Sequence, residues 1–434
     1  MNKKVNILRT RPLVATSLSI LLFSICSYHY LTRVGINLKI LIVLSALTVL
    51  ISLANEAKSF FIGIAKEPRK HFLIICILVS AIGGLIINFA NIIEISFFTI
   101  LFLLVHLIFI NKDNDLINLV TKLVICSGVF MSVGVLTALF ESIFLSSTLF
   151  YEIYGSGYPA ISDQKQFFKG FGFSHNYSAQ IIIIALSFLS LSQSTLSRKL
   201  RNYLTSLFTF ALLITGSRIV FLLFSLIACN YFIKTRTNKY LMSAILISLY
   251  LFLSHILIGV HGNYEIGSVH YREVLFSIGN VDFVLGNYGH MKLAYFAELK
   301  ENFFFPVNLS EISQSLTTDP HSLIFSLIIL GGVPLALSVV IFLILGISKN
   351  LPFIEHNYSI FYYCGLISII TETFMWDASN SIFFWIIILY ATTISKDSCP
   401  PDNIKYIKKK LNEKKVLFHF YSHSSKGFRP RQYP

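Results

Sequence analysis

The sequence has few charged residues for its length. Only 13% of its 434 residues are charged, whereas 55% are hydrophobic and the mean hydropathy is +0.70. A soluble domain carries about 25% charged residues. The composition therefore excludes an ordinary soluble protein and predicts an all-α, polytopic membrane protein whose main partner is the lipid bilayer.

Several common signals are also missing. The six cysteines have no paired spacing and mostly lie in apolar stretches, so neither a disulfide framework nor a zinc site is predicted. The chain has no Walker phosphate loop and no dinucleotide-binding glycine pattern, and we expect no cofactor. No small-residue cleavage site follows the first apolar run, so we expect that run to remain as a helix.

Long apolar segments dominate what is present. A helix needs about 20 mostly apolar residues to cross the hydrocarbon core of a membrane. About twelve such spans are predicted, at 12–31, 37–55, 72–90, 93–111, 117–144, 176–193, 203–216, 218–233, 240–260, 321–346, 357–375 and 381–395. Residues 1–395 then form one integral membrane domain, and residues 396–434 form a basic tail.

The basic residues predict the orientation of these spans. Of the 35 lysines and arginines, 26 fall in the two tails and in one alternating set of loops, as is typical of cytoplasmic segments. Both termini are therefore predicted to be cytoplasmic. A helix break at Thr215–Arg218 is favoured over the alternative of one long helix at 203–233, because the single helix would place Lys234 and Arg236 outside. The net charge of +14 is then a surface that faces anionic lipid, and no nucleic-acid partner is expected.

Two outside segments are too long to be simple turns. They cover residues 145–175 and 261–320, and long loops in compact folds are usually functional. The second segment is predicted to contain short helices. One of these is an amphipathic helix over 271–278, with Arg272 near its start.

Arg218 is the one charged residue between Leu204 and Ile233. It could be an arginine that reaches from a helix end to the membrane interface. It also follows the predicted break, where a new helix begins with unpaired N–H groups. A helix N-terminus beside an arginine is suited to an anion, such as a lipid-linked phosphate at the outer face.

The other candidate residues lie in the second outside segment or near the outer ends of predicted spans. Arg272 is either half of an exposed ion pair with a nearby glutamate, or a bidentate ligand for phosphate oxygens. His321 is either an interface histidine or a general base oriented by Asp319, which could instead cap the helix. His175 and Glu372 are candidate contacts to a sugar donor or acceptor.

These residues resemble a known superfamily, the O-antigen ligases and polymerases of bacterial inner membranes. The resemblance rests on Thr215–Arg218, on the segment from Arg272 to Gly289, on Pro320–Leu323 followed by Gly331–Pro334, and on about twelve spans with cytoplasmic ends. It covers most of residues 170–395. The family commonly has asparagine after the histidine, and this chain has Ser322 there.

The resemblance implies a metal-independent, inverting transfer of a glycan from undecaprenyl diphosphate at the periplasmic side of the inner membrane. Arg218 and Arg272 would bind the diphosphate, and His321 would activate the acceptor hydroxyl. A chain-length regulator is a further partner of this type of enzyme. The motifs leave the acceptor open. A polymerase would extend another repeat unit, whereas a ligase would transfer the glycan to lipid A–core, and a flippase remains an alternative of a different class.

Overall fold

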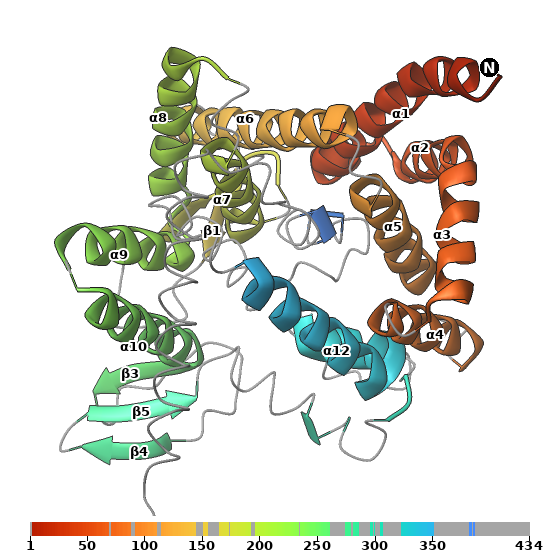
Figure 1. Cartoon of the computed structure of the whole chain (residues 1–434). Helices are drawn as coiled ribbons and strands as arrows, with labels where there is room; N and C mark the ends of the chain where they lie inside the picture. The colour runs from red at the N-terminus through yellow and green to blue at the C-terminus, as the bar shows by residue number, and fades with distance from the viewer. Residues whose placement is uncertain are drawn as a thin grey trace, which may run out of the picture.

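The computed structural model describes residues 2–68, 71–87, 92–110, 114–144, 151–154, 165–172, 174–191, 196–233, 235–260, 274–278, 281–285, 296–297, 299, 304–306, 323–350, 382–383 and 385–386. This part of the chain is mostly helical, with two small antiparallel sheets (Figure 1). The predicted helical character is therefore confirmed.

The helices are α1 (Asn2–Arg33), α2 (Lys39–Ser52), α3 (Ala54–Lys66), α4 (Phe72–Ile87), α5 (Ile92–Ile110), α6 (Asn114–Phe144), α7 (His175–Leu191), α8 (Arg198–Thr215), α9 (Arg218–Phe232), α10 (Arg236–His255) and α12 (Leu323–Asn350). The strands are β1 (Tyr151–Tyr154), β2 (Lys165–Phe168), β3 (Ile256–Val260), β4 (Val274–Ile278) and β5 (Val281–Leu285).

Apolar helices give the molecule its membrane character. Three described segments are long and apolar enough to cross a membrane: Pro12–Arg33, Asp115–Phe144 and Leu323–Phe342. The bent pair of α2 and α3 would make a fourth. Five further apolar helices, in α4, α5, α7, α9 and α10, are shorter. The arrangement of twelve spans with cytoplasmic termini stays a prediction.

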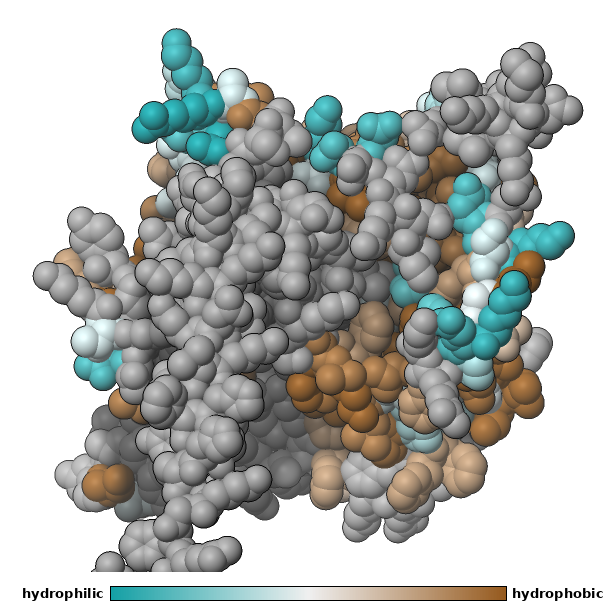
Figure 2. Space-filling view, in the orientation of Figure 1, coloured by the Kyte–Doolittle hydropathy of each residue, from teal (hydrophilic) through white to brown (hydrophobic). Residues whose placement is uncertain are grey.

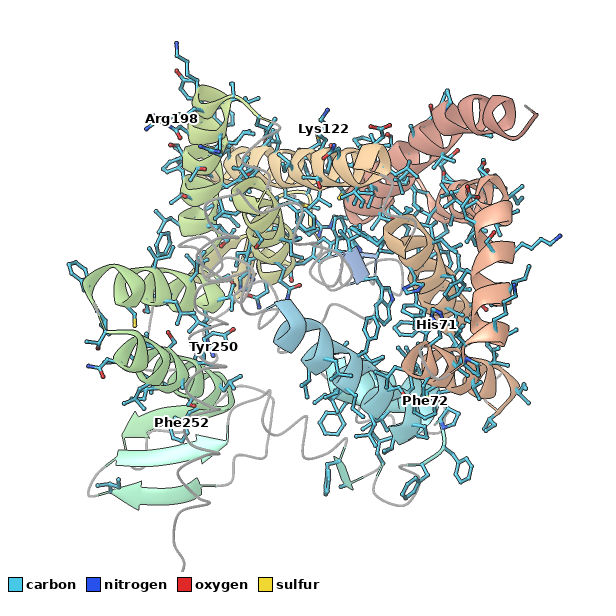
Figure 3. All side chains as sticks on the ribbon, viewed as in Figure 1. His71, Phe72, Lys122, Arg198, Tyr250 and Phe252 are labelled. Carbon is cyan, nitrogen blue, oxygen red and sulfur yellow. The ribbon has the colours of Figure 1, made fainter. Side chains whose placement is uncertain are left out.

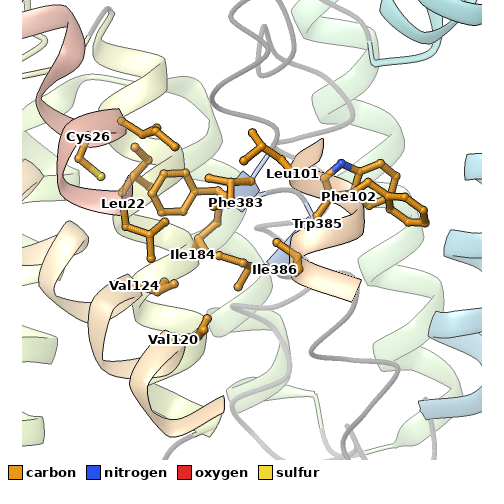
Figure 4. Close-up of a cluster of buried hydrophobic side chains, with 14 of the residues drawn as sticks. Leu22, Cys26, Leu101, Phe102, Val120, Val124, Ile184, Phe383, Trp385 and Ile386 are labelled. Carbon is orange, nitrogen blue, oxygen red and sulfur yellow. The ribbon is translucent and has the colours of Figure 1, made fainter. Parts of the chain in front are cut away.

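Large apolar side chains lie both inside and outside the molecule. Inside, side chains from α1, α5, α6 and α7 meet Phe383, Trp385 and Ile386, all fully or almost fully buried (Figure 4). Trp385 packs on Phe102 with the ring centroids 4.5 Å apart. Outside, apolar side chains cover the region of α12 in Figure 2. An apolar core combined with an apolar surface is what a protein in a lipid solvent needs.

The long segment predicted to carry short helices contains strands instead. The predicted helix over 271–278 is wrong, because Val274–Ile278 is strand β4 and pairs with β5 in a sheet of order β3-β5-β4. β-branched and aromatic residues favour strands. The register pairs Ile278 with Val281, so two residues, Gly279-Asn280, connect the strands, and such pairs are typical of hairpins.

The predicted span at 240–260 is wrong in its last five residues for the same reason. Helix α10 ends at His255, and Ile256–Val260 forms strand β3, paired with β5. A short apolar run rich in isoleucine and valine fits a buried helix end and a strand equally well. The partner strand β5 decides between them, and it lies more than twenty residues further along the chain.

Helix α3 occupies most of the segment 56–71, which was predicted to be a connecting loop. The chain bends by 66° between α2 and α3. Lys58 and Lys66 share α3 with apolar residues, of which Phe60 is buried and Phe61 is exposed. A helix that carries both basic and apolar residues is typical of a membrane surface, and Lys58 and Lys66 belong to such a helix.

Helix α12 is interrupted in its middle. Gly331 and Gly332 have non-helical backbone angles, and Gly332 has φ +72°. The backbone of Phe304 lies directly against Gly332, where a side chain would collide with it. The predicted span at 321–346 is thus present as a kinked helix that packs against α4.

Candidate functional site

The predicted break between α8 and α9 is confirmed. Helix α8 ends at Thr215, and Gly216 follows in the left-handed region at φ +69°, a conformation that glycine adopts without strain. The Thr215 hydroxyl donates to the Leu212 carbonyl at 2.7 Å, and the Ser217 N–H donates to the Thr215 hydroxyl at 3.3 Å. These bonds close the end of α8 and turn the chain, so α8 and α9 run in different directions (Figure 1).

Arg218 is the first residue of α9, and its side chain is exposed. Its neighbours differ from it, because Thr215 and Ser217 are almost completely buried. Within the described part of the chain, no hydrogen bond or ion pair holds the Arg218 guanidinium. The cation therefore follows a turn in which the Thr215 and Ser217 side chains are buried.

The opposite end of α8 carries the basic residues Arg198, Lys199 and Arg201 (Figure 3 labels Arg198). With 18 residues, α8 is about 27 Å long at 1.5 Å per residue. This length is close to the thickness of the hydrocarbon core of a membrane, about 30 Å. The basic cluster thus lies at one end of α8, and Arg218 follows the other end, about 21 to 26 Å away along the helix axis.

A second helix begins beside Arg218. The hydroxyl of Ser174 accepts from the Tyr177 N–H at 3.2 Å and caps the start of α7. His175 and Asn176, the first two residues of α7, are both half-buried. This location of His175, at the start of a helix, matches its predicted position at the end of a span.

One hydrogen bond joins the starts of α7 and α9. The Ser217 hydroxyl donates to Asn176 Oδ1 at 2.7 Å, although the two residues are 41 positions apart. Ser217 is the residue before α9, but its side chain makes no capping bond to the first turn of that helix. The bond brings the two helix N-termini together, with His175 on one side and Arg218 on the other.

A tight turn supports the start of α7. The Lys169 carbonyl accepts from the Gly172 N–H at 3.1 Å and from the Ser178 hydroxyl at 2.5 Å. Gly170 has φ +57°, and a Cβ there would lie 2.5 Å from the backbone of Gly134 on α6. The turn is thus pressed directly against a helix backbone.

Helix α1 holds the same turn from the other side. Arg33 Nη2 donates to the Gly172 carbonyl at 2.8 Å. The Tyr30 ring lies 4.9 Å from the Phe171 ring, and the His29 ring lies 5.7 Å from the Tyr177 ring, measured between centroids. The end of α1, the turn at 169–172 and the starts of α7 and α9 therefore form one packed region, which we call the α7–α9 junction.

The junction concentrates features that attract an anion. Two helix N-termini meet there, and each carries a partial positive charge from its unpaired N–H groups. Arg33, Lys169, His175 and Arg218 add basic side chains from four different segments. An anionic group with several oxygens is the chemical class that this arrangement suits best.

Four predicted site residues lie outside the described residues: Arg272, Asp319, His321 and Glu372. Their approach to Arg218 stays a prediction. Of the predicted site residues, the structure places Arg218 and His175, and it brings the segments that carry them together.

No group of three histidine, cysteine, aspartate or glutamate side chains is arranged to hold a metal ion within the described residues. That the reaction needs no metal remains a prediction about the chemistry.

The sequence analysis missed two residues of the junction. Neither Arg33 nor Asn176 was predicted to be a site residue. The sequence around each residue does not reveal its contact, because the partner is far along the chain. Gly172 is 139 positions from Arg33, and Ser217 is 41 positions from Asn176. The only available signal was that Asn176 and Ser217 both lie at predicted outer ends of spans.

No protein-family model matches this chain, and no curated protein matches it.

Proposed function

We propose that the protein is a membrane glycosyltransferase that polymerises a surface polysaccharide of the O-antigen type. It would join the glycan of one undecaprenyl-diphosphate-linked repeat unit to another repeat unit at the periplasmic face of the inner membrane. The proposal combines the sequence resemblance with the α7–α9 junction.

The observation that carries the proposal is the position of Arg218. An exposed guanidinium follows a helix break, beside the start of a second helix and at the opposite end of α8 from a basic cluster. A diphosphate attached to a membrane lipid needs a cationic group at the membrane face, because its charge cannot enter the hydrocarbon core.

The proposed reaction needs three kinds of group. The acceptor hydroxyl attacks the anomeric carbon of the donor sugar, and His321 takes the hydroxyl proton. The bond between the anomeric carbon and the diphosphate oxygen breaks, and its electron pair leaves with undecaprenyl diphosphate. Arg218 and Arg272 neutralise the charge that develops on this leaving group. Attack opposite the leaving group inverts the anomeric configuration.

His175, Asp319 and Glu372 have supporting roles in this proposal. His175 lies at the junction and would contact a sugar of the donor. Asp319 would orient His321, and Glu372 would contact the acceptor.

A deletion strain tests the proposed function. Its surface glycan would be separated by length on gels, next to the parent and a complemented strain. Polymerase function predicts lipopolysaccharide with a single repeat unit. Core-only lipopolysaccharide, with long polymer retained on undecaprenyl diphosphate, would instead identify a ligase. Repeat units accumulating on the cytoplasmic side would contradict glycosyl transfer and indicate a flippase.

A further inference from the structure

Asn176 is the residue at the junction to which no role has been assigned. Its side-chain oxygen accepts a hydrogen bond from the hydroxyl of Ser217, the residue directly before Arg218. Asn176 belongs to the first turn of α7, which is capped by Ser174 and braced by the 169–172 turn. Asn176 is thus a fixed point on one helix that holds the first residues of another.

The direction of this bond matters for the neighbouring helix. A serine before a helix usually accepts a hydrogen bond from the N–H groups of the first turn. The Ser217 hydroxyl donates to Asn176 instead, so its side chain caps no N–H group of α9. The Ser217 backbone carbonyl accepts from the Val220 N–H at 3.1 Å, which leaves the Arg218 and Ile219 N–H groups of the first turn. An anion at the start of α9 would meet the Arg218 and Ile219 N–H groups and the Arg218 guanidinium together.

We infer that Asn176 is a positioning residue for the diphosphate site at Arg218. Its bond to Ser217 fixes where α9 begins and keeps the Arg218 and Ile219 N–H groups available to the ligand. Asn176 acts through Ser217 and need not touch the ligand itself. This inference rests on the proposed function.

Binding of undecaprenyl diphosphate to the purified full-length protein in detergent tests the inference, by titration calorimetry and by competition with inorganic pyrophosphate. Asn176→Ala should weaken binding about tenfold, because it leaves the buried Ser217 hydroxyl without its partner. Ser217→Ala should weaken binding to a similar extent. It removes the same bond from the other side, and it also serves if Asn176→Ala fails to fold.

Three further variants separate positioning from a general loss of structure. Ser217→Thr keeps the hydroxyl and therefore the hydrogen bond to Asn176, so it should bind undecaprenyl diphosphate within about twofold of wild type. The double variant Asn176→Ala/Ser217→Ala should bind no worse than the weaker single variant, because both changes remove one bond. Asn238→Ala changes an exposed asparagine on α10 and should bind like wild type.

The outcomes distinguish this inference from the proposed function. If Arg218→Ala loses binding while Asn176→Ala and Ser217→Ala bind like wild type, the positioning role is wrong and the diphosphate site stands. Additive losses in the double variant would also overturn the positioning role. If wild type does not bind undecaprenyl diphosphate, or Arg218→Ala binds it normally, the proposed function fails and the inference fails with it.

Discussion

The residues just before Arg218, and not its own side chain, make the contacts that position its guanidinium. Gly216 supplies the left-handed turn, Thr215 closes α8, and Ser217 ties the start of α9 to Asn176. The charged group itself is exposed and stays available to a ligand. At the scale of single residues, the described part of the candidate site is thus a hydrogen-bonded turn followed by the exposed Arg218 guanidinium.

Replacing Arg218 should reveal its role directly. Arg218→Ala should reduce polymer in a complemented deletion strain about 100-fold or more, the usual effect of removing a donor that stabilises developing charge. Arg218→Lys should retain part of the activity, because lysine keeps the charge but not the bidentate geometry. The length distribution of the surface glycan measures both effects.

The matched control is Lys199→Ala, which removes an exposed basic residue from the other end of α8. It should leave the glycan unchanged. Wild-type polymer from Arg218→Ala, with the protein present in the membrane, would remove Arg218 from the site.

Gly170 should be needed for stability. An alanine there would have to adopt φ +57° and would place its Cβ 2.5 Å from the Gly134 backbone. We expect Gly170→Ala to lower the free energy of unfolding by about 2 kcal/mol or more. Thermal unfolding in detergent measures the change.

Gly63→Ala is the control for this substitution. Gly63 lies inside α3, and a Cβ there would meet no atom within 4 Å. Alanine at this position should raise stability by up to about 1 kcal/mol. Equal unfolding temperatures for Gly170→Ala and wild type would show that the turn does not press against α6.

At the scale of elements, the sequence predicted helices well where local chemistry decides the structure. The break at Thr215–Arg218 was predicted from a glycine and a serine between two apolar runs, together with the cytoplasmic side predicted for Lys234. The strands β3 to β5 were missed because an apolar run does not reveal its partner. Helix α3 was missed because it is only partly apolar, and the Asn176–Ser217 bond because it joins distant segments.

Proline substitutions can distinguish the observed sheet from the predicted helix. β5 is the central strand, so the backbone N–H of each of its paired residues faces a neighbouring strand. β4 is an edge strand, and half of its N–H groups face away from the sheet. We expect Phe283→Pro to disrupt the sheet strongly and Ser277→Pro to disrupt it less. Limited proteolysis between residues 256 and 285 would report the loss of structure.

A helix over 271–278 would give the reverse order. Ser277→Pro would then be the disruptive change, and Phe283→Pro, beyond the end of that helix, would have little effect.

At the scale of the whole molecule, the positions of the basic residues predict which parts of the chain lie on each side of the membrane. Basic residues are predicted to mark the cytoplasmic side, and Arg218 would then face outward from the other end of α8. Cysteine labelling in a cysteine-free background tests this arrangement. Lys199→Cys should react only with reagents on the cytoplasmic side, whereas Ile36→Cys, exposed between α1 and α2, should react from outside. Labelling of both positions from one side would contradict the predicted topology.

Glycosyl transfer by the purified protein is the most direct measurement. Wild-type protein in liposomes would receive a synthetic undecaprenyl-diphosphate-linked repeat unit in excess EDTA, and the products would be separated by length. We predict a ladder of longer lipid-linked glycans with release of one undecaprenyl diphosphate per bond formed, and no ladder with Arg218→Ala. Absence of any transfer by wild type, or transfer by Arg218→Ala at the wild-type rate, would contradict the proposed chemistry. Activity lost in EDTA and restored by Mg²⁺ would contradict its metal independence.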